Sequence, residues 1–341
     1  MDIYKFALLG FGNVGQAFAR LLLIKREELR IQHDLDWLVV GIMTGKHGAA
    51  INPRGIDLDD ALKMIDEGES LDPLSTEPIP QNGVEFVRAC KADVLFENTP
   101  VSYQDGQPAI ENISAALSSG MHAITANKGP VVHAYLELTK MAQENQKRFL
   151  FESTVMDGAP IFSLWREALP AVELKSFRGI LNSTTNVILT LMEEGKSFND
   201  AVAFTQSIGI AETDPSGDIE GWDAAVKVSA LVTVLMGESL KPSEVDRKGI
   251  ESIQSEDIQT ASAEGKRWKL ICQAEKTDAG IKKSVQPELL DPSDPLYSVT
   301  GTSSAVTFHS DSLGPLTITE SDPGPDTTAY GLLADFINAV R

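Results

Sequence analysis

The chain is poor in cysteine, in positive charge and in long apolar runs, and each shortage excludes a class of protein. Its two cysteines, Cys90 and Cys272, stand in neither a metal-ligand nor a redox spacing, so we expect free thiols in a reducing compartment. The formal net charge of −20 disfavours nucleic acid and anionic membranes, which attract basic surfaces. The longest apolar stretch, Val228–Met236, cannot span a bilayer, and no signal peptide is visible. The sequence predicts a cytoplasmic protein that binds neither nucleic acid nor membrane.

The 341 residues exceed what one hydrophobic core usually supports, and the pattern of strands and helices changes along the chain. Residues 1–155 alternate apolar strands with amphipathic helices, which is typical of a parallel sheet with helices on both faces. Within them, Thr44–Gly83 predicts loops around one short helix, Leu58–Asp66. Residues 156–318 mix helices and strands as a second, α+β domain does, and residues 319–341 end in an amphipathic helix. We therefore expect an α/β fold of two domains.

A glycine-rich turn follows the first predicted strand. Gly10, Gly12 and Gly15 form the motif G-F-G-N-V-G and lead into a helical run. The first glycine permits a tight turn, the second lets the backbone approach a pyrophosphate, and the third lets helix and strand pack closely. The helix N-terminus, at Asn13 and Val14, offers amide donors and a positive dipole end to the phosphates. The strand before and the helix after favour a dinucleotide site over an ordinary glycine-rich turn.

The end of the second predicted strand bears on the choice between NAD and NADP. An NAD site usually carries an acid there, which binds the ribose hydroxyls. This chain instead continues from Met43 into Thr44, Gly45, Lys46 and His47, with no carboxylate. Lys46 and His47 could meet a 2′-phosphate, although loops carry polar residues for solvation alone as well. The pattern favours NADP and leaves NAD open.

Polar residues also follow three other predicted strands, at the edge where open α/β sheets bind their ligands. The segments are Glu97–Pro100, Asn127–Lys128 and Glu152–Val155. Taken alone, a lysine such as Lys128 is more often an exposed surface residue than part of a binding site. Its place at a strand end beside Gly129 favours a role in a site.

A second candidate centre lies in the predicted α+β domain. A carboxylate-rich loop with Glu212 and Asp218 leads into a helix, on which Asp223 and Lys227 stand at i and i+4 on one face. Such pairs are commonly exposed salt bridges. Residues 224–236, however, are otherwise almost wholly apolar, which is typical of a buried helix. Asp223 and Lys227 would then lie in or against a cleft, where a paired lysine is a candidate for charge stabilisation or proton transfer.

The five histidines show no nucleophile–base pairing and no metal-ligand spacing. They are His33, His47, His122, His133 and His309. Hydride transfer assisted by lysine and carboxylate groups therefore fits the sequence better than acyl transfer or zinc hydrolysis.

The run D-P-S-G-D-I-E-G-W-D-A-A-V-K, within Glu212–Lys227, resembles the signature of the homoserine dehydrogenase family at every fixed position. Gly120–Pro130, Phe151–Pro160 and Gly179–Leu189 resemble the family's lysine-bearing segment, cation-binding hinge and substrate loop. The resemblance implies a Rossmann-type first domain, a second domain for catalysis and dimerisation, and a C-terminal segment that returns to the nucleotide domain. It implies a homodimer that interconverts two small molecules, L-aspartate 4-semialdehyde and L-homoserine, with NAD(P)H.

The resemblance also assigns roles to single residues. Lys128 and Lys227 would be the catalytic lysines, with Asp223 orienting Lys227, since a cation beside the carbonyl oxygen stabilises the alkoxide that forms as hydride arrives. The substrate would be bound by Glu212, at its ammonium group, together with Asp218, Asn182 and Thr184. The cofactor would be bound by Gly10, Gly12, Asn13, Val14, Gly15, Thr44, Lys46, Thr99, Pro100, Lys128 and Gly324. A structural sodium ion would be held by Glu152 and the carbonyls of Val155, Asp157 and Ala159.

The chain departs from the family pattern in three places. Met156 and Asp157 replace glycines, Ser183 replaces another, and residues 321–326 keep only Gly324 of a glycine run near the nicotinamide. Missing glycines there could block close approach of the backbone. Two alternatives stay open, a dehydrogenase of another small amino or hydroxy aldehyde and a non-catalytic NADP-binding regulator. The retained lysines and carboxylates argue against the regulator. The chain has no room for the regulatory domain of longer members, so we expect no threonine feedback through such a domain.

Overall fold

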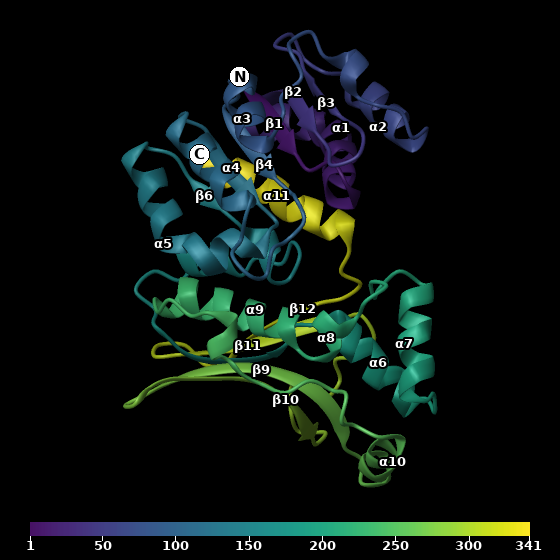
Figure 1. Ribbon diagram of the computed structural model, residues 1–341. Coiled ribbons are helices and arrows are strands. Elements are labelled where there is room, and N and C mark those ends of the chain that lie inside the picture. Colours follow the sequence, from purple (N-terminus) through teal and green to yellow (C-terminus); the bar gives the residue numbers. More distant parts are fainter. The chain divides into compact units, whose positions relative to one another are not determined.

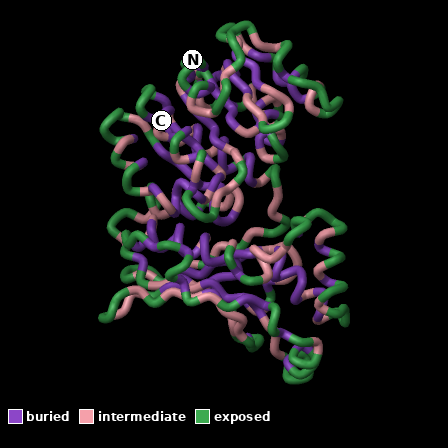
Figure 2. Tube along the Cα trace, viewed as in Figure 1, coloured by how far each residue is buried: buried purple, intermediate pink, exposed green.

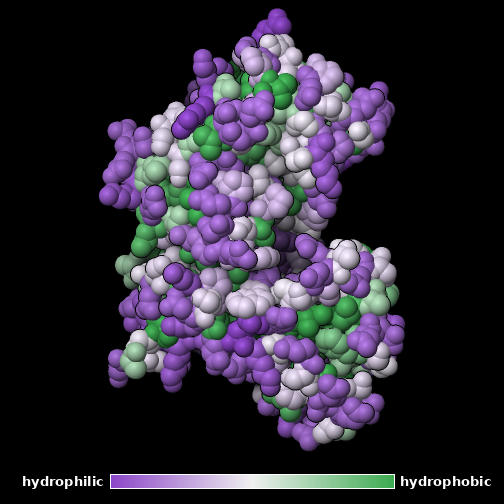
Figure 3. All heavy atoms as spheres, in the orientation of Figure 1, coloured by the Kyte–Doolittle hydropathy of each residue, from purple (hydrophilic) through white to green (hydrophobic).

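In the computed structural model, which describes residues 1–341, the chain forms two units (Figure 1). The first unit combines Met1–Ile161 with Gly324–Arg341, and the second consists of Phe162–Pro323. Each unit contains one six-stranded sheet. Figure 2 shows that the buried residues concentrate in these sheets, whereas the face seen in Figure 3 is mainly hydrophilic. No helix has both the length and the apolar character needed to cross a membrane.

The sheet of the first unit has the strand order β3-β2-β1-β4-β5-β6. Its strands are β1 (Asp2–Leu9), β2 (Leu35–Met43), β3 (Ala49–Ile51), β4 (Val94–Glu97), β5 (His122–Thr125) and β6 (Phe149–Leu150). All neighbouring pairs are parallel except β2 and β3. The chain order of strands reverses direction across the sheet between β1 and β4, and ligands of open α/β sheets bind at such a switch point.

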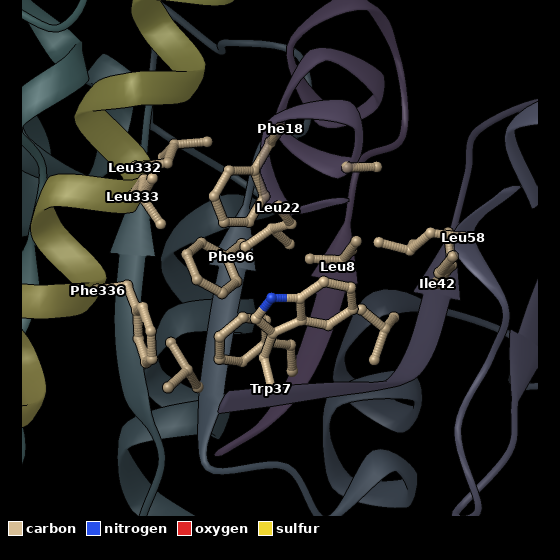
Figure 4. Close-up of a cluster of buried hydrophobic side chains, with 14 of the residues drawn as sticks. Leu8, Phe18, Leu22, Trp37, Ile42, Leu58, Phe96, Leu332, Leu333 and Phe336 are labelled. Atoms are coloured by element: carbon tan, nitrogen blue, oxygen red, sulfur yellow. The ribbon is translucent and has the colours of Figure 1, made fainter. Parts of the chain in front are cut away.

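Helices cover both faces of this sheet. They are α1 (Asn13–His33), α2 (Leu58–Asp66), η1 (Asp72–Leu74), α3 (Gly83–Cys90), α4 (Ala109–Ser118), α5 (Lys128–Glu144), η2 (Glu152–Thr154) and α11 (Pro325–Val340). Alternate residues of β1 face opposite sides, as the two-residue period of a strand requires. Phe6 and Leu8 enter a core with α1, α2 and α11, whereas Ala7 and Leu9 pack with α3 and α4. Figure 4 shows the first core, to which α1 contributes Phe18, β4 contributes Phe96 and α11 contributes Phe336.

The sheet of the second unit has the order β12-β11-β7-β9-β10-β8. Its strands are β7 (Leu174–Ile180), β8 (Asp246–Arg247), β9 (Arg267–Thr277), β10 (Gly280–Leu290), β11 (Ser304–Ser310) and β12 (Leu316–Glu320). All pairs are antiparallel except β8 with β10. The helical segments are η3 (Leu164–Ala168), α6 (Ser183–Glu193), α7 (Phe198–Ser207), α8 (Ser216–Ile219), α9 (Trp222–Leu231), η4 (Val232–Met236), η5 (Pro242–Glu244) and α10 (Ser255–Ala263). Side chains at the start of α6 and along α9 form the polar cluster described below.

The expected α/β fold is confirmed, with one correction between Thr44 and Gly83. This stretch was expected to hold only loops and one helix, and it also contains β3, η1 and the start of α3. The strand β3 spans three residues, too few to show an alternating pattern, and it exists because its backbone pairs with Gly41–Met43. Edge pairing of this kind has no signature in the local sequence.

Lys269 is a charged residue in the core of the second unit. Its side chain is completely buried in β9, where the ammonium Nζ lies 3.0 Å from Oδ1 of Asn186 on α6. Burial lowers the pKa of the Lys269 ammonium to about 8, although the nearby Glu193 carboxylate opposes this shift. The folded state therefore holds this proton less tightly than the unfolded chain does.

We expect the Lys269→Met variant to report this burial as a pH-dependent stability difference. The wild-type free energy of unfolding, relative to that of the variant, should rise with pH between about 8 and 10.5. Within that window the unfolded chain binds the extra proton, so raising the pH favours the folded state, by on the order of 3 kcal/mol in total. Urea unfolding of both proteins at several pH values measures the difference, in which titrating groups that do not interact with Lys269 cancel. A difference that is flat across the window contradicts the prediction.

Candidate active site

The glycine-rich turn after β1 is tightly packed at its two ends and open in its middle. Gly10 has a φ of +92°, and a Cβ atom there would overlap the carbonyl of Asn98 after β4. A Cβ at Gly15 would overlap the carbonyl oxygen of Gly10. At Gly12, the N-cap of α1, no atom lies within 4 Å of the position that a Cβ would take. The turn thus leaves room for a ligand at the amides that begin α1, at Asn13 and Val14.

The turn after β2 closes on itself through Thr44. Its hydroxyl oxygen accepts a hydrogen bond of 2.6 Å from the His47 amide, and its own amide donates to the carbonyl of Gly48 at 3.0 Å. The His47 ring nitrogen Nδ1 lies 3.0 Å from the Glu69 carbonyl oxygen, whereas Lys46 is exposed. The Asp72 carboxylate, distant in sequence, accepts a hydrogen bond of 3.0 Å from the Ala49 amide. Sequence reasoning missed this acid, because it reaches the turn from η1.

A buried carboxyl group joins the ends of β4 and β5. Glu97 is fully buried, and one of its oxygens accepts hydrogen bonds from the amide and the hydroxyl of Thr99. The Thr125 hydroxyl lies 3.0 Å from its other oxygen. Burial raises the pKa of the Glu97 carboxyl. Asn127 caps α5 by accepting from the Gly129 amide, and its Nδ2 donates to the Thr99 carbonyl at 3.1 Å.

This network orients two of the predicted segments. It holds Thr99 and Pro100 beside the start of α5, where Lys128 is the first helical residue and is half-buried. Sequence reasoning placed the two segments at strand ends but did not foresee that Glu97 and Thr125 would tie them together. The only local hint of this network in the sequence is an acidic residue, Glu97, directly after a predicted buried strand.

The predicted hinge Phe151–Pro160 lies within the first unit, and its helical turn η2 packs against α11. The Glu152 carboxylate is buried, and its Oε1 accepts a hydrogen bond of 2.6 Å from the Ile161 amide. The Glu152 amide donates to the Asp335 carboxylate at 2.7 Å. Asp157, with a φ of +38°, lies 3.4 Å from the Thr327 hydroxyl through its Oδ2. Gly324 is the N-cap of α11, and nothing lies within 4 Å of a Cβ built there.

Four of the predicted residues meet at the start of α6 in the second unit. Asn182 is the N-cap of α6, and its Oδ1 accepts a hydrogen bond from the Thr185 amide. Its Nδ2 donates to Asp218 at 2.6 Å and to Asp223 at 3.1 Å. Burial and the neighbouring Asp223 carboxylate raise the pKa of Asp218, although hydrogen bonds from Asn182 and Thr184 lower it. One amide group therefore bridges two carboxylates that would otherwise repel each other.

Lys227 adds the positive charge of this cluster. Its Nζ donates a hydrogen bond of 2.6 Å to the carbonyl of Leu181 and lies 3.5 Å from Oδ2 of Asp223. The two side chains are only 15% and 13% exposed, so the pair is not an ordinary surface salt bridge. The Leu181 carbonyl was not foreseen from the sequence, because Leu181 and Lys227 lie 46 residues apart and meet only in the fold. A lysine ammonium carries three donors, and the structure assigns two of them to these partners.

The structure brings together Asn182, Thr184, Asp218, Asp223 and Lys227, but not every predicted substrate residue. Glu212 is exposed, and its carboxylate makes no hydrogen bond to this cluster; only its carbonyl accepts, from Gln206 at 3.2 Å. Lys128 and the glycine-rich turn belong to the first unit. The arrangement can bind a small cationic substrate at its carboxylates and place an ammonium donor beside a reacting oxygen.

Comparisons with known proteins bear on both units. A family model described as homoserine dehydrogenase matches residues 160–337, and one described as the NAD binding domain of homoserine dehydrogenase matches residues 10–152. An NAD(+)-dependent homoserine dehydrogenase of Pseudomonas canavaninivorans is 34% identical over 339 residues, covering 99% of this chain and 96% of that protein. A homoserine dehydrogenase of Methanocaldococcus jannaschii is 35% identical over 342 residues, covering 99% and 98%. A solved structure of a hyperthermophilic archaeal homoserine dehydrogenase in complex with NADPH shares 31% identity and a TM-score of 0.84, covering 99% and 98%.

Proposed function

Because the chain belongs to the homoserine dehydrogenase family, we propose that the polar cluster at α6 and α9 interconverts L-homoserine and L-aspartate 4-semialdehyde. The observation that carries the proposal is the Lys227 ammonium, held between the Leu181 carbonyl and Asp223 and next to the Asn182-bridged carboxylates. A nicotinamide dinucleotide, bound at the glycine-rich turn, supplies or accepts the hydride.

The residues of the cluster would divide the work. Asp218, with Glu212 on the adjoining loop, would pair with the substrate ammonium. Lys227 would donate a proton to the oxygen of the aldehyde as hydride reaches its carbon, and would take that proton back in the reverse direction. Asp223 would hold Lys227 in place, and Asn182 and Thr184 would hold the carboxylates. Lys128, at the start of α5, is the second lysine to which the family resemblance gives a catalytic role, since a positive charge stabilises a developing alkoxide.

The proposal also covers the choice of cofactor. The open position at Gly12, the amides at Asn13 and Val14 and the segment Thr99–Pro100 would bind the dinucleotide, with Gly324 at the nicotinamide end. Lys46 is exposed near the end of β2, where it could pair with the 2′-phosphate of NADP. No carboxylate follows that strand directly, so the turn favours NADP over NAD.

An assay of homoserine oxidation, followed by the absorbance of the reduced nicotinamide, tests both parts. We expect turnover with a higher kcat/KM for NADP than for NAD. A strong preference for NAD would refute the assignment of Lys46. A protein that binds the dinucleotide but does not oxidise homoserine would refute the proposed reaction.

We also propose a structural sodium ion at the hinge. The buried Glu152 carboxylate and the backbone carbonyls of Val155, Asp157 and Ala159 would supply oxygen donors, which a hard cation prefers. The ion would neutralise the buried Glu152 charge and brace the segment against α11. Sodium should therefore raise the thermal unfolding temperature relative to a large organic cation at equal ionic strength.

We also propose a cytoplasmic homodimer, as the resemblance implies. Both cysteines are buried and unpaired, in keeping with a reducing compartment. Light scattering after size-exclusion chromatography should give twice the mass of one chain, and a monomer mass would refute the dimer.

A further inference from the structure

The turn between Asp218 and Asp223 is held from outside the cluster by an arginine. Arg247 lies on the edge strand β8, which pairs with β10. Its guanidinium carbon lies 3.7 Å from the ring centroid of Trp222, and its Nη1 donates a hydrogen bond to the carbonyl of Glu220. Both contacted residues lie between the two carboxylates that Asn182 bridges.

Arg247, Trp222 and Glu220 form a clamp on the turn, and neighbouring residues strengthen it. The Trp222 indole donates to the Glu220 carboxylate at 3.1 Å, so the ring and the turn are joined directly. The Ile250 amide donates to the carbonyl of Ile219 at 2.9 Å. A Cβ at Gly249 would overlap the Ile219 carbonyl and the Cα of Glu220, which shows how closely the segment after β8 follows the turn.

The turn itself needs such support. Gly221 has a φ of +80°, and Glu220 and Gly221 join the short helix α8 to α9. The surrounding loop carries Glu212, Asp214, Asp218 and Glu220, and like charges so close together repel one another. Arg247 brings a positive charge to this loop and a flat surface for Trp222, and the strand that carries it is fixed by the sheet.

We propose that Arg247 is a positioning residue for the reaction, which sets the spacing of Asp218 and Asp223 through Glu220 and Trp222. The inference rests on the proposed function of the cluster. Arg247 touches neither carboxylate in the structure and acts through the turn alone. Asp218 would bind the substrate and Asp223 orients Lys227, so a shift of the turn changes both KM and kcat. Displacements of about 1 Å at a catalytic group cost up to roughly 10²-fold in rate.

The test compares Arg247→Gln, Arg247→Lys and the matched control Arg267→Gln. Arg267 lies in the same unit, its guanidinium carbon is 4.8 Å from the Tyr297 ring centroid, and it pairs with Glu193. We expect Arg247→Gln to lower kcat/KM for homoserine roughly tenfold or more, with a raised KM, while the Kd of the dinucleotide stays unchanged. Arg247→Lys should recover part of the loss, since it keeps the charge and the contact with the ring. Arg267→Gln should keep the wild-type KM.

A second measurement follows the turn itself and needs no substrate. Amide hydrogen exchange in residues 218–223 should be faster in Arg247→Gln than in wild type or in Arg267→Gln. Faster exchange with an unchanged KM overturns the proposal, because the clamp then does not reach the site. Unchanged exchange overturns it as well. A wild-type protein that fails to oxidise homoserine refutes the proposed function, while hydrogen exchange still decides whether Arg247 orders the turn.

Discussion

Lys227→Met should lower kcat for homoserine oxidation by roughly 10²-fold or more, because Lys227 is the proposed proton donor to the reacting oxygen. The Lys227 ammonium is the only cation among the site residues of the second unit, and the Leu181 carbonyl and Asp223 hold it at one place. Methionine keeps the length of the side chain and removes its charge and donors. Steady-state kinetics at saturating dinucleotide measure the effect.

The same substitution at a lysine remote from the cluster separates chemistry from stability. Lys276 forms an ion pair of 2.9 Å with Glu173 in the same unit. Lys276→Met should retain the wild-type kcat, as surface ion pairs contribute about 1 kcal/mol or less. A Lys227→Met protein with a near wild-type kcat would make Lys227 an ordinary salt-bridge lysine.

Gly12→Val should abolish tight dinucleotide binding while the protein still folds. The space around a Cβ at Gly12 is open and the φ of this residue is −82°, so the native backbone accepts a side chain. The added methyl groups would occupy the path of the pyrophosphate to the α1 amides. We expect the Kd to rise roughly 10²-fold, the equivalent of about one charge-assisted hydrogen bond. Titration with the reduced dinucleotide, monitored by fluorescence, gives the Kd.

Gly10→Val provides the contrast. Its φ of +92° and the adjacent Asn98 carbonyl leave no place for a side chain, so this variant should lose stability as well as binding. Thermal unfolding distinguishes the two cases. If Gly12→Val binds the dinucleotide as tightly as wild type, the pyrophosphate does not lie at this turn.

Local patterns in the sequence predict those parts of the molecule that depend on neighbouring residues. The motif at Gly10–Gly15 and the pair Asp223 and Lys227 are encoded within a few residues, so their placement on a turn and on one helix face could be predicted. The pairing of β3 with β2 could not, since only backbone atoms determine it.

Contacts between distant segments were the other part that could not be predicted. Asn182 reaches Asp218 and Asp223 across at least 36 residues, and Asp72 reaches Ala49 from η1. Such contacts depend on how strands and helices pack against one another. Hydrophobic periodicity predicts the strands and helices but not their packing.

The double use of Asn182 restricts how this site can change during evolution. Its amide oxygen caps α6, and its amide nitrogen bridges the two carboxylates. One side chain therefore stabilises a helix and also holds the site together. Aspartate could still cap the helix but would bring a third negative charge to the cluster, and serine would be too short to bridge. New substrate preferences are therefore more accessible through residues around the carboxylates than through Asn182 itself.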